Sequence, residues 1–183
     1  MHLNPRMPHQ YFLFLRALNV SGKNIIKMAD LKSILTQNGF ENVMTYIQSG
    51  NIIFNSPLQK SKILIQIHQL ILDNFNLSIS LFIYTKEQLI KILENNPFKE
   101  PLEGNKVFIT FLMNEMNSEI SKELGSIKFE NEFFKISEQT LYLYLQEGMG
   151  KSKLNNSFWE QKLKMKTTGR NRNTIEKILL LTV

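Results

Sequence analysis

Three short segments carry residue types that bind anions. Two are glycine-containing loops between an expected strand and an expected helix: residues 19–24 (Asn-Val-Ser-Gly-Lys-Asn) and residues 148–152 (Gly-Met-Gly-Lys-Ser). A glycine turn at a helix start exposes backbone N–H groups, and the neighbouring lysine adds positive charge, so both loops could hold a phosphate group. The alternative is that the glycines only let the chain turn.

The third segment, residues 167–174, reads Thr-Thr-Gly-Arg-Asn-Arg-Asn-Thr and precedes an expected helix. Arg170 and Arg172, set among hydroxyl and amide side chains, could clamp a phosphate or carboxylate group. The alternative is an ordinary loop whose Asn and Thr side chains cap the following helix. The segment therefore predicts either an anion site or only a helix start.

Several common catalytic designs are excluded. The chain has no cysteine, which rules out disulfides, thiol nucleophiles and thiolate metal sites. The histidines, His2, His9 and His68, lack metal-ligand spacing, and no nucleophile elbow or carboxylate pair stands out. Residues 148–152 resemble the end of a Walker A motif, but Leu145 stands where its first glycine belongs. We expect no metal and no cofactor, and whether the protein is an enzyme stays open.

The net charge of +6 comes from the C-terminal part of the chain. Fourteen basic and fourteen acidic residues balance up to Gly150, whereas residues 151–183 hold eight basic and two acidic ones. A clustered basic surface attracts phosphates and nucleic acid, although lysines on the solvated faces of closing helices are the more ordinary explanation. The basic residues of this segment are Lys151, Lys153, Lys162, Lys164, Lys166, Arg170, Arg172 and Lys177.

Apolar spacing predicts a ferredoxin-like βαββαβ unit over residues 10–84. Its expected elements are a strand (11–18), a helix ending at Gly39, a hairpin (43–54) that turns at Gln48-Ser49-Gly50-Asn51, a helix (63–71) and a strand (78–84). Four antiparallel strands with two helices on one face are the expected arrangement. Gln48, Ser49 and Asn51 should then lie near residues 19–24, because both loops follow strand ends of one sheet.

A second, related α+β half is predicted over residues 106–183, after a helix and linker at 85–105. Thr85 and Gln88 have capping-box spacing for that helix, and Pro97 to Asn105 reads as the linker. The expected elements are a strand (106–113), a helix (117–124), a hairpin (128–145), a helix (154–165) and a helix (174–181) capped by Asn173. The half thus ends in a helix where a last strand would complete the pattern.

Four aromatic residues lie on the expected strands of this half: Phe133, Phe134, Tyr142 and Tyr144. Such rings could stack bases as in sheet-based RNA binders, although core packing is their more frequent use. The RNA-binding signature of basic residue, glycine and alternating aromatics is missing from every expected strand. The N-terminal residues lack the apolar stretch of a signal peptide or a membrane span, so a cytoplasmic protein is expected.

Two segments of the chain resemble the motifs of a known family. The first is residues 16–24 (Arg-Ala-Leu-Asn-Val-Ser-Gly-Lys-Asn), followed by Lys27-Met28, and the second is residues 45–54 (Thr-Tyr-Ile-Gln-Ser-Gly-Asn-Ile-Ile-Phe). They are similar to the motifs R-G-x-N-V-G-G-K-N-x-x-x-M and T-Y-I-Q-S-G-N-V-V-F of the bacterial domain-of-unknown-function 1697 family. The family's later landmarks are matched, in order, by Asn96-Pro97-Phe98, residues 148–154, and Arg170-Asn171 with Thr174.

Three positions depart from the family pattern: Ala17 replaces a usual glycine, Lys151 a usual arginine and Arg172 a usual tryptophan. The resemblance implies an α+β fold with ferredoxin-like units, a cytoplasmic bacterial protein and no agreed activity. It supplies no catalytic residues.

The sequence therefore favours a protein that binds a phosphate-bearing ligand, with nucleic acid as one such partner. A small enzyme acting on an anionic metabolite, with Arg16, Lys23 and Asn51 around a cleft, is the first alternative, and a non-enzymatic partner-binding protein is the second. The expected ligand-binding residues are Arg16, Asn19, Gly22, Lys23, Asn24, Gln48, Ser49, Asn51, Lys151, Arg170 and Asn171.

Overall fold

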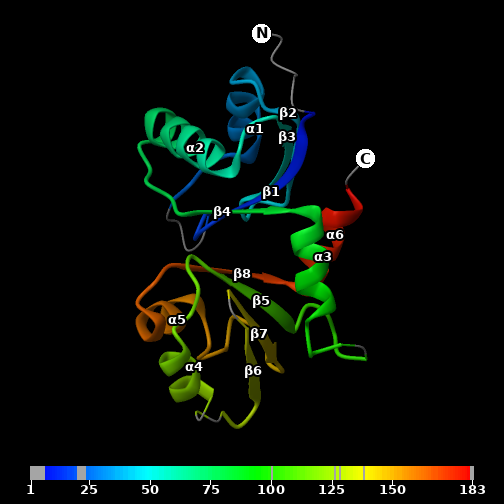
Figure 1. Ribbon diagram of the computed structural model, residues 1–183, viewed down its shortest axis with the longest axis vertical. Coiled ribbons are helices and arrows are strands. Elements are labelled where there is room, and N and C mark those ends of the chain that lie inside the picture. The colour runs from blue at the N-terminus through cyan, green and yellow to red at the C-terminus, as the bar shows by residue number, and fades with distance from the viewer. Residues whose placement is uncertain are drawn as a thin grey trace. The chain divides into compact units, whose positions relative to one another are not determined.

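The computed structural model describes residues 7–19, 24–99, 101–125, 127, 129–137 and 139–181 (Figure 1). The chain divides into two compact units, one extending to Gln88 and the other running from Leu89 to Leu181. The same succession of elements, β-α-β-β-α-β-α, occurs twice along the chain. The expected ferredoxin-like unit and related second half are thereby confirmed.

The first unit contains a four-stranded antiparallel sheet in the order β2-β3-β1-β4. Its strands are β1 (His9–Leu15), β2 (Glu41–Tyr46), β3 (Asn51–Ser56) and β4 (Leu81–Thr85), and its helices are α1 (Met28–Gln37) and α2 (Lys60–Phe75). Strand β1 lies between β3 and β4, which is the order that βαββαβ connections produce.

The core of the first unit lies between one face of this sheet and both helices. Tyr11, Leu13 and Leu15 alternate along β1 and point to that face, as the two-residue period of a strand requires. The helices contribute residues at three- and four-residue spacing, so that each presents one apolar stripe. These residues are Met28, Leu31 and Leu35 from α1, and Ile63, Ile67 and Ile71 from α2. Two helices on one face of the sheet were expected.

The helix α3 (Lys86–Glu94) begins with the predicted capping box. The Gln88 N–H donates to Thr85 Oγ1 at 3.4 Å, and the Thr85 N–H donates to Gln88 Oε1 at 3.0 Å. This reciprocal pair satisfies two of the N–H groups that a helix start leaves without intrahelical partners.

The second unit contains another antiparallel sheet, in the order β6-β7-β5-β8. Its elements are β5 (Val107–Leu112), α4 (Ser118–Gly125), β6 (Glu132–Ser137), β7 (Thr140–Leu145), α5 (Asn156–Leu163), β8 (Thr167–Asn171) and α6 (Arg172–Leu180). Leu141, Leu143 and Leu145 of β7 pack with Trp159 and Leu163 of α5. Strands β6 and β8 are the edges of this sheet.

The strand β8 corrects the expectation that residues 167–174 form a loop before the last helix. Thr167 to Asn171 pair with β5 and complete the pattern that the sequence left unfinished. The segment has no apolar residue, so hydrophobic alternation gave no strand signal, although Thr167 and Thr168 are buried. The last helix begins at Arg172, and Asn171 rather than Asn173 caps it: its Oδ1 accepts the Thr174 N–H at 2.8 Å.

Candidate functional site

The two predicted loops of the first unit lie at the same end of its sheet. Asn19 links them: its Nδ2 donates to the Gln48 carbonyl oxygen at 2.7 Å and to the Ile26 carbonyl oxygen at 2.9 Å. Its Oδ1 accepts the Ile26 N–H at 2.9 Å. The expected neighbourhood of the Asn19 loop and the Gln48 turn is therefore present, and Asn19 itself is used to hold it together.

These two loops concentrate left-handed backbone. Ala17, Asn19, Asn24 and Ile47 have φ between 49° and 54°, and Gly50 has φ 75°. Such a conformation costs about 1–2 kcal/mol for a residue with a Cβ, and a β-branched residue such as Ile47 adopts it rarely. The Asn24 Nδ2 donates to the Ala17 carbonyl oxygen at 3.1 Å and helps to fix this geometry. Strain of this kind clusters at functional loops and is a reason to keep the pair as a candidate site.

Not every predicted ligand residue of the first unit reaches the surface. Asn51 is fully buried, and its Nδ2 donates to the Tyr46 carbonyl oxygen at 3.1 Å and to Ser49 Oγ at 3.0 Å. Asn51 therefore shapes the turn from inside. Gln48 is exposed, whereas Arg16 and Ser49 are half-buried. Gly22 and Lys23 lie outside the described residues.

The Gly148 loop in the second unit uses much of its own hydrogen-bonding capacity. The N–H groups of Gly148, Lys151 and Ser152 donate to carbonyl oxygens of the loop and of Leu145, at 2.9–3.4 Å. The Lys153 N–H donates to the Glu132 carboxylate at 3.1 Å, so that a protein carboxylate already occupies one anion-binding position. Lys151 itself is exposed and pairs with Glu147 at 3.4 Å.

The other predicted residues of this unit are also engaged. Arg170 lies on β8, is 9% exposed, and donates from Nη1 to Thr168 Oγ1 at 3.0 Å and to the Gly169 carbonyl oxygen at 2.8 Å. Burial lowers the pKa of Arg170 to about 10. Asn171 caps α6, as described above. Arg170 and Arg172 are thus buried, which separates them from the exposed Lys162, Lys164 and Lys166 of the basic C-terminal segment.

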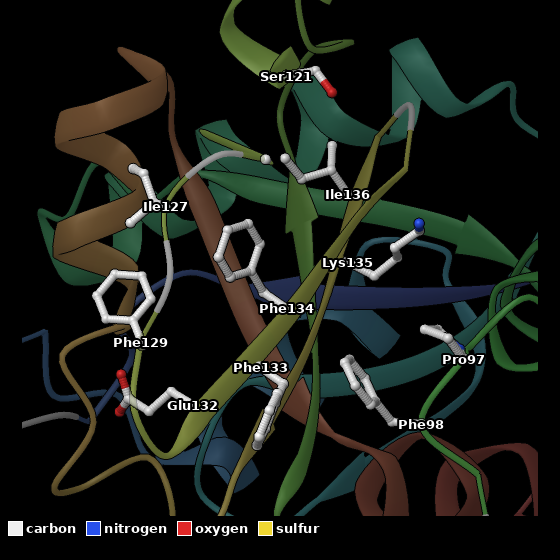
Figure 2. Close-up of a pocket in the computed structure, with 11 residues that line it drawn as sticks. Pro97, Phe98, Ser121, Ile127, Phe129, Glu132, Phe133, Phe134, Lys135 and Ile136 are labelled. Atoms are coloured by element: carbon white, nitrogen blue, oxygen red, sulfur yellow. The ribbon is translucent and has the colours of Figure 1, made fainter. Parts of the chain in front are cut away.

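A groove of about 720 Å³ runs along the edge strand β6. Figure 2 shows Phe134, Phe129 and Ile127 on one side of this strand and Phe98, Pro97 and Lys135 on the other. Phe133 projects from β6 with 45% of its surface exposed, which is unusual for a phenylalanine on a sheet. The residues that line the groove are Pro97, Phe98, Ser121, Gly125, Ile127, Phe129, Glu132, Phe133, Phe134, Lys135 and Ile136.

Three aromatic rings form a row on the face of the second sheet that carries Phe133. Phe133 and Tyr144 are directly opposite each other in the β6–β7 pair, with ring centroids 6.0 Å apart and an interplanar angle of 21°. The ring centroid of Phe98 lies 6.1 Å from that of Tyr144. We call Phe98, Tyr144 and Phe133 the aromatic row. It ends at the exposed ring of Phe133.

The backbone around Phe98 is fixed from two directions. The side chain of Asn96, which is buried, donates to the Phe98 carbonyl oxygen at 3.1 Å and accepts the Phe98 N–H at 3.0 Å. Arg172 donates from Nη1 to the same carbonyl oxygen at 3.3 Å and from Nη2 to the Leu102 carbonyl oxygen at 2.7 Å. Residues expected to form a linker are thereby attached to the start of α6.

Lys135 supplies a positive charge beside the row. It lies two residues after Phe133 on β6, so both side chains project from the same face of the sheet. Lys135 is exposed and has no ion-pair partner among the residues described. Across the β6–β7 pair lies Tyr142, whose hydroxyl donates to the Ile92 carbonyl oxygen at 3.0 Å and whose pKa is raised by burial. The exposed part of the face is therefore its β6 edge.

Sequence reasoning proposed the rings of Phe133 and Tyr144 as possible base-stacking groups but left them, with Phe98 and Lys135, out of the expected site. The two-residue spacing of Phe133 and Lys135 in a predicted strand was the signal that could have found this pair. The place of Phe98 depends on contacts with α6 and has no local signal.

The described part of the chain holds no group of three acidic or histidine side chains able to bind a metal ion. Within those same residues, no helix has the length and apolar character needed to cross a bilayer.

Comparisons with known proteins agree with this fold. A solved structure, described as a conserved bacterial protein SP0830 from Streptococcus pneumoniae, is similar over 96% of this chain and 98% of its own, with a TM-score of 0.75 and 24% identity. No curated protein matches. Residues 9–142 match the family model described as a protein of unknown function, DUF1697. The chain therefore belongs to the DUF1697 family of proteins of unknown function.

Proposed function

We propose that the second unit binds single-stranded nucleic acid at the aromatic row and Lys135. The observation that supports this most is the stacked pair of Phe133 and Tyr144, which ends in a ring that is 45% exposed beside a groove. One RNA-binding module with a four-stranded sheet, the RRM, binds RNA by stacking two or three bases on aromatic rings of the sheet.

The exposed surface of the Phe133 ring can stack on a base, whereas a ring in the core stacks on other protein groups. Base–aromatic stacking contributes about 1–3 kcal/mol per base and tolerates any base, because each has a π-face. The central positions of this face are less available, since Tyr142 is buried. We therefore expect one or two bases to stack at the β6 edge, and the binding to be weak and nearly independent of base sequence.

The backbone of the bound strand would lie near Lys135. Two residues along a strand span about 7 Å, so the ammonium group lies within reach of a phosphate attached to a base on Phe133. Lysines of the basic segment, among them the exposed Lys162, Lys164 and Lys166, raise the positive potential of the protein as a whole. A cytoplasmic setting, expected from the sequence, belongs to this proposal.

The test is a titration of fluorescein-labelled single-stranded DNA and RNA of mixed sequence, followed by fluorescence anisotropy at several salt concentrations. Each phosphate neutralised should contribute about 0.7 to the slope of log K against log [salt]. Lys135→Ala should reduce that slope by about 0.7. Lys162→Ala, which removes an exposed lysine from α5, is the matched control and should change the slope less. Absence of binding by the wild-type protein at low salt would end the proposal.

A second candidate function is supported by the strained loop pair of the first unit. The left-handed backbone at Ala17, Asn19, Asn24 and Ile47 is the kind of strain that accompanies ligand sites. A small anionic metabolite held near Gln48 is the ligand class that fits, with an enzymatic role still open. Thermal stabilisation that saturates with one phosphorylated or carboxylated metabolite and persists in high salt would favour this candidate over nucleic acid.

A further inference from the structure

A small group of polar side chains lies where α5 meets strands β5 and β8 of the second unit. Thr110 of β5 and Thr167 of β8 are fully buried. Their Oγ1 atoms, and Oδ1 of Asn156 at the start of α5, have no hydrogen-bond partner among the described residues. Buried hydroxyl and amide oxygens are nearly always hydrogen-bonded in proteins, so three such atoms in one region need an explanation.

Gly169 shows where two of these oxygens point. It is the direct partner of Thr110 in the β5–β8 pair. A Cβ on Gly169 would lie 3.4 Å from Thr110 Oγ1, 3.4 Å from Asn156 Oδ1 and 4.0 Å from Met149 Cε. Both oxygens therefore lie beside the position that a side chain of residue 169 would take, and glycine leaves that position without one.

Thr167 belongs to the same face of β8, since it lies two residues before Gly169. Its backbone N–H donates to Glu160 Oε1 at 2.9 Å, so its main chain is satisfied from α5 while its hydroxyl is not. Asn156 and Glu160 are four apart on α5 and share the side that faces β8.

We propose that one water molecule is bound beside Gly169 by Thr110 and Asn156 and is a fixed part of the second unit. A water donates two hydrogen bonds and accepts two, whereas a threonine hydroxyl can do either. The water can donate to Asn156 Oδ1 and accept from the Thr110 hydroxyl. Buried waters typically make about three hydrogen bonds to polar groups that the protein leaves unsatisfied, and Thr167, two residues before Gly169 on β8, is the candidate third partner. The water would link α5 to β5.

Two substitutions should change Tm differently depending on whether the cluster holds a water molecule or is dry. Thr110→Val keeps the shape and removes the hydroxyl. If the water is bound, the variant deprives it of one hydrogen-bond partner. Tm should then fall by about 2–4 °C, which is the effect of losing one hydrogen bond in a chain of this size. In a dry cluster, the same variant removes a buried oxygen that has no partner, and Tm should rise. A rise would overturn the proposal.

Gly169→Ala places a methyl group where the water is expected. It should lower Tm by about 3–6 °C by expelling the water and leaving its partners unsatisfied. The control is Gly150→Ala, whose Cβ meets nothing within 4 Å, and Tm should change little. In a dry cluster Gly169→Ala should be neutral or stabilising, because alanine is preferred to glycine within a strand. A neutral result would therefore count against the water.

A crystal structure of the wild-type protein provides the direct reading. Electron density for one water within about 3.2 Å of both Thr110 Oγ1 and Asn156 Oδ1 is expected. Empty space at that point would overturn the proposal. Density that gains an anomalous signal after a rubidium soak would overturn it as well, since the ligand would then be a monovalent cation.

Discussion

The ring of Phe133 lies 6.0 Å from the ring of Tyr144, nearly parallel to it, on neighbouring strands of the second sheet. Tyr144 also lies 6.1 Å from the ring of Phe98, whereas 45% of the surface of Phe133 is exposed. A stacked pair with one exposed ring offers a stacking surface to a planar ligand such as a base.

Replacing Phe133 with alanine should weaken binding of single-stranded oligonucleotides by about 10-fold, because one stacking contact of about 1.4 kcal/mol is lost. The anisotropy titration measures this change. Phe134→Ala is the matched control, since Phe134 projects from the opposite face of β6 and contacts Trp159 at 5.2 Å. That variant should be the less stable of the two on urea unfolding, yet bind oligonucleotides more tightly than Phe133→Ala. Equal binding by both variants would contradict a site on the Phe133 face.

Arg172→Ala should destabilise the second unit by about 1.5–3 kcal/mol, because the partly buried carbonyl oxygens of Phe98 and Leu102 lose a charged donor. Arg172→Lys should recover only part of this, since a single ammonium group cannot reproduce the guanidinium fork. Urea unfolding measures the change in free energy, and hydrogen exchange should show faster exchange around residues 96–105. If Arg172→Ala unfolds at the wild-type midpoint, these contacts do not hold the segment.

Gly50→Ala should be more damaging than Gly148→Ala. Both glycines have nearly the same left-handed φ, 75° and 76°, so the backbone cost of about 1–2 kcal/mol applies to each. Only at Gly50 would the new Cβ lie 2.8 Å from Leu15 Cβ, inside the core, where overpacking adds about 1–3 kcal/mol. The difference in Tm between the two variants measures the cost of this overpacking. Equal losses would show that the turn can move away from Leu15.

The stability of the protein should decrease above pH 10, partly because of Tyr142. Burial raises the pKa of Tyr142 in the folded state, so above the unfolded pKa, near 10, the unfolded state holds fewer protons. The stabilising contribution is complete below pH 10 and is lost as pH rises through the folded pKa. Tyr142→Phe should reduce the slope of Tm against pH between pH 9.5 and 11, at the cost of the hydrogen bond to Ile92. An unchanged slope would contradict the assignment.

The fold of the first unit could be predicted from the sequence because its core residues are apolar and regularly spaced. Leu13 and Leu15, or Ile63 and Ile67, show the strand and helix periods directly. Strand β8 could not be found in this way, since Thr167 and Thr168 are buried without being apolar and are paired with a strand far away in the chain. Residues 167–171 form a strand because they pair with β5, which is distant in the sequence.

The fold is confirmed, whereas the predicted ligand-binding residues stay a prediction. Glycine and lysine next to an expected helix indicated anion loops, but the N–H groups of Gly148, Lys151 and Ser152 bond within their own loop. Phe98 reaches the aromatic row because Arg172, 74 positions later, bonds to its carbonyl oxygen. No local pattern reports such a contact. The sequence therefore indicated residue types that could bind a phosphate and offered Phe133 and Tyr144 as stacking rings, but it did not indicate that Phe98 lies beside them.

The most direct measurement of the central claim is an NMR titration of protein labelled on its phenylalanine rings with a short single-stranded oligonucleotide at low salt. A base stacked on Phe133 shields its ring protons, so these should move upfield. The rings of Phe134 and Phe129, on the other side of β6, should move little. Shifts confined to the backbone amides of Asn24, Gln48 and their neighbours, with the ring of Phe133 unmoved, would contradict the account and place the ligand in the first unit.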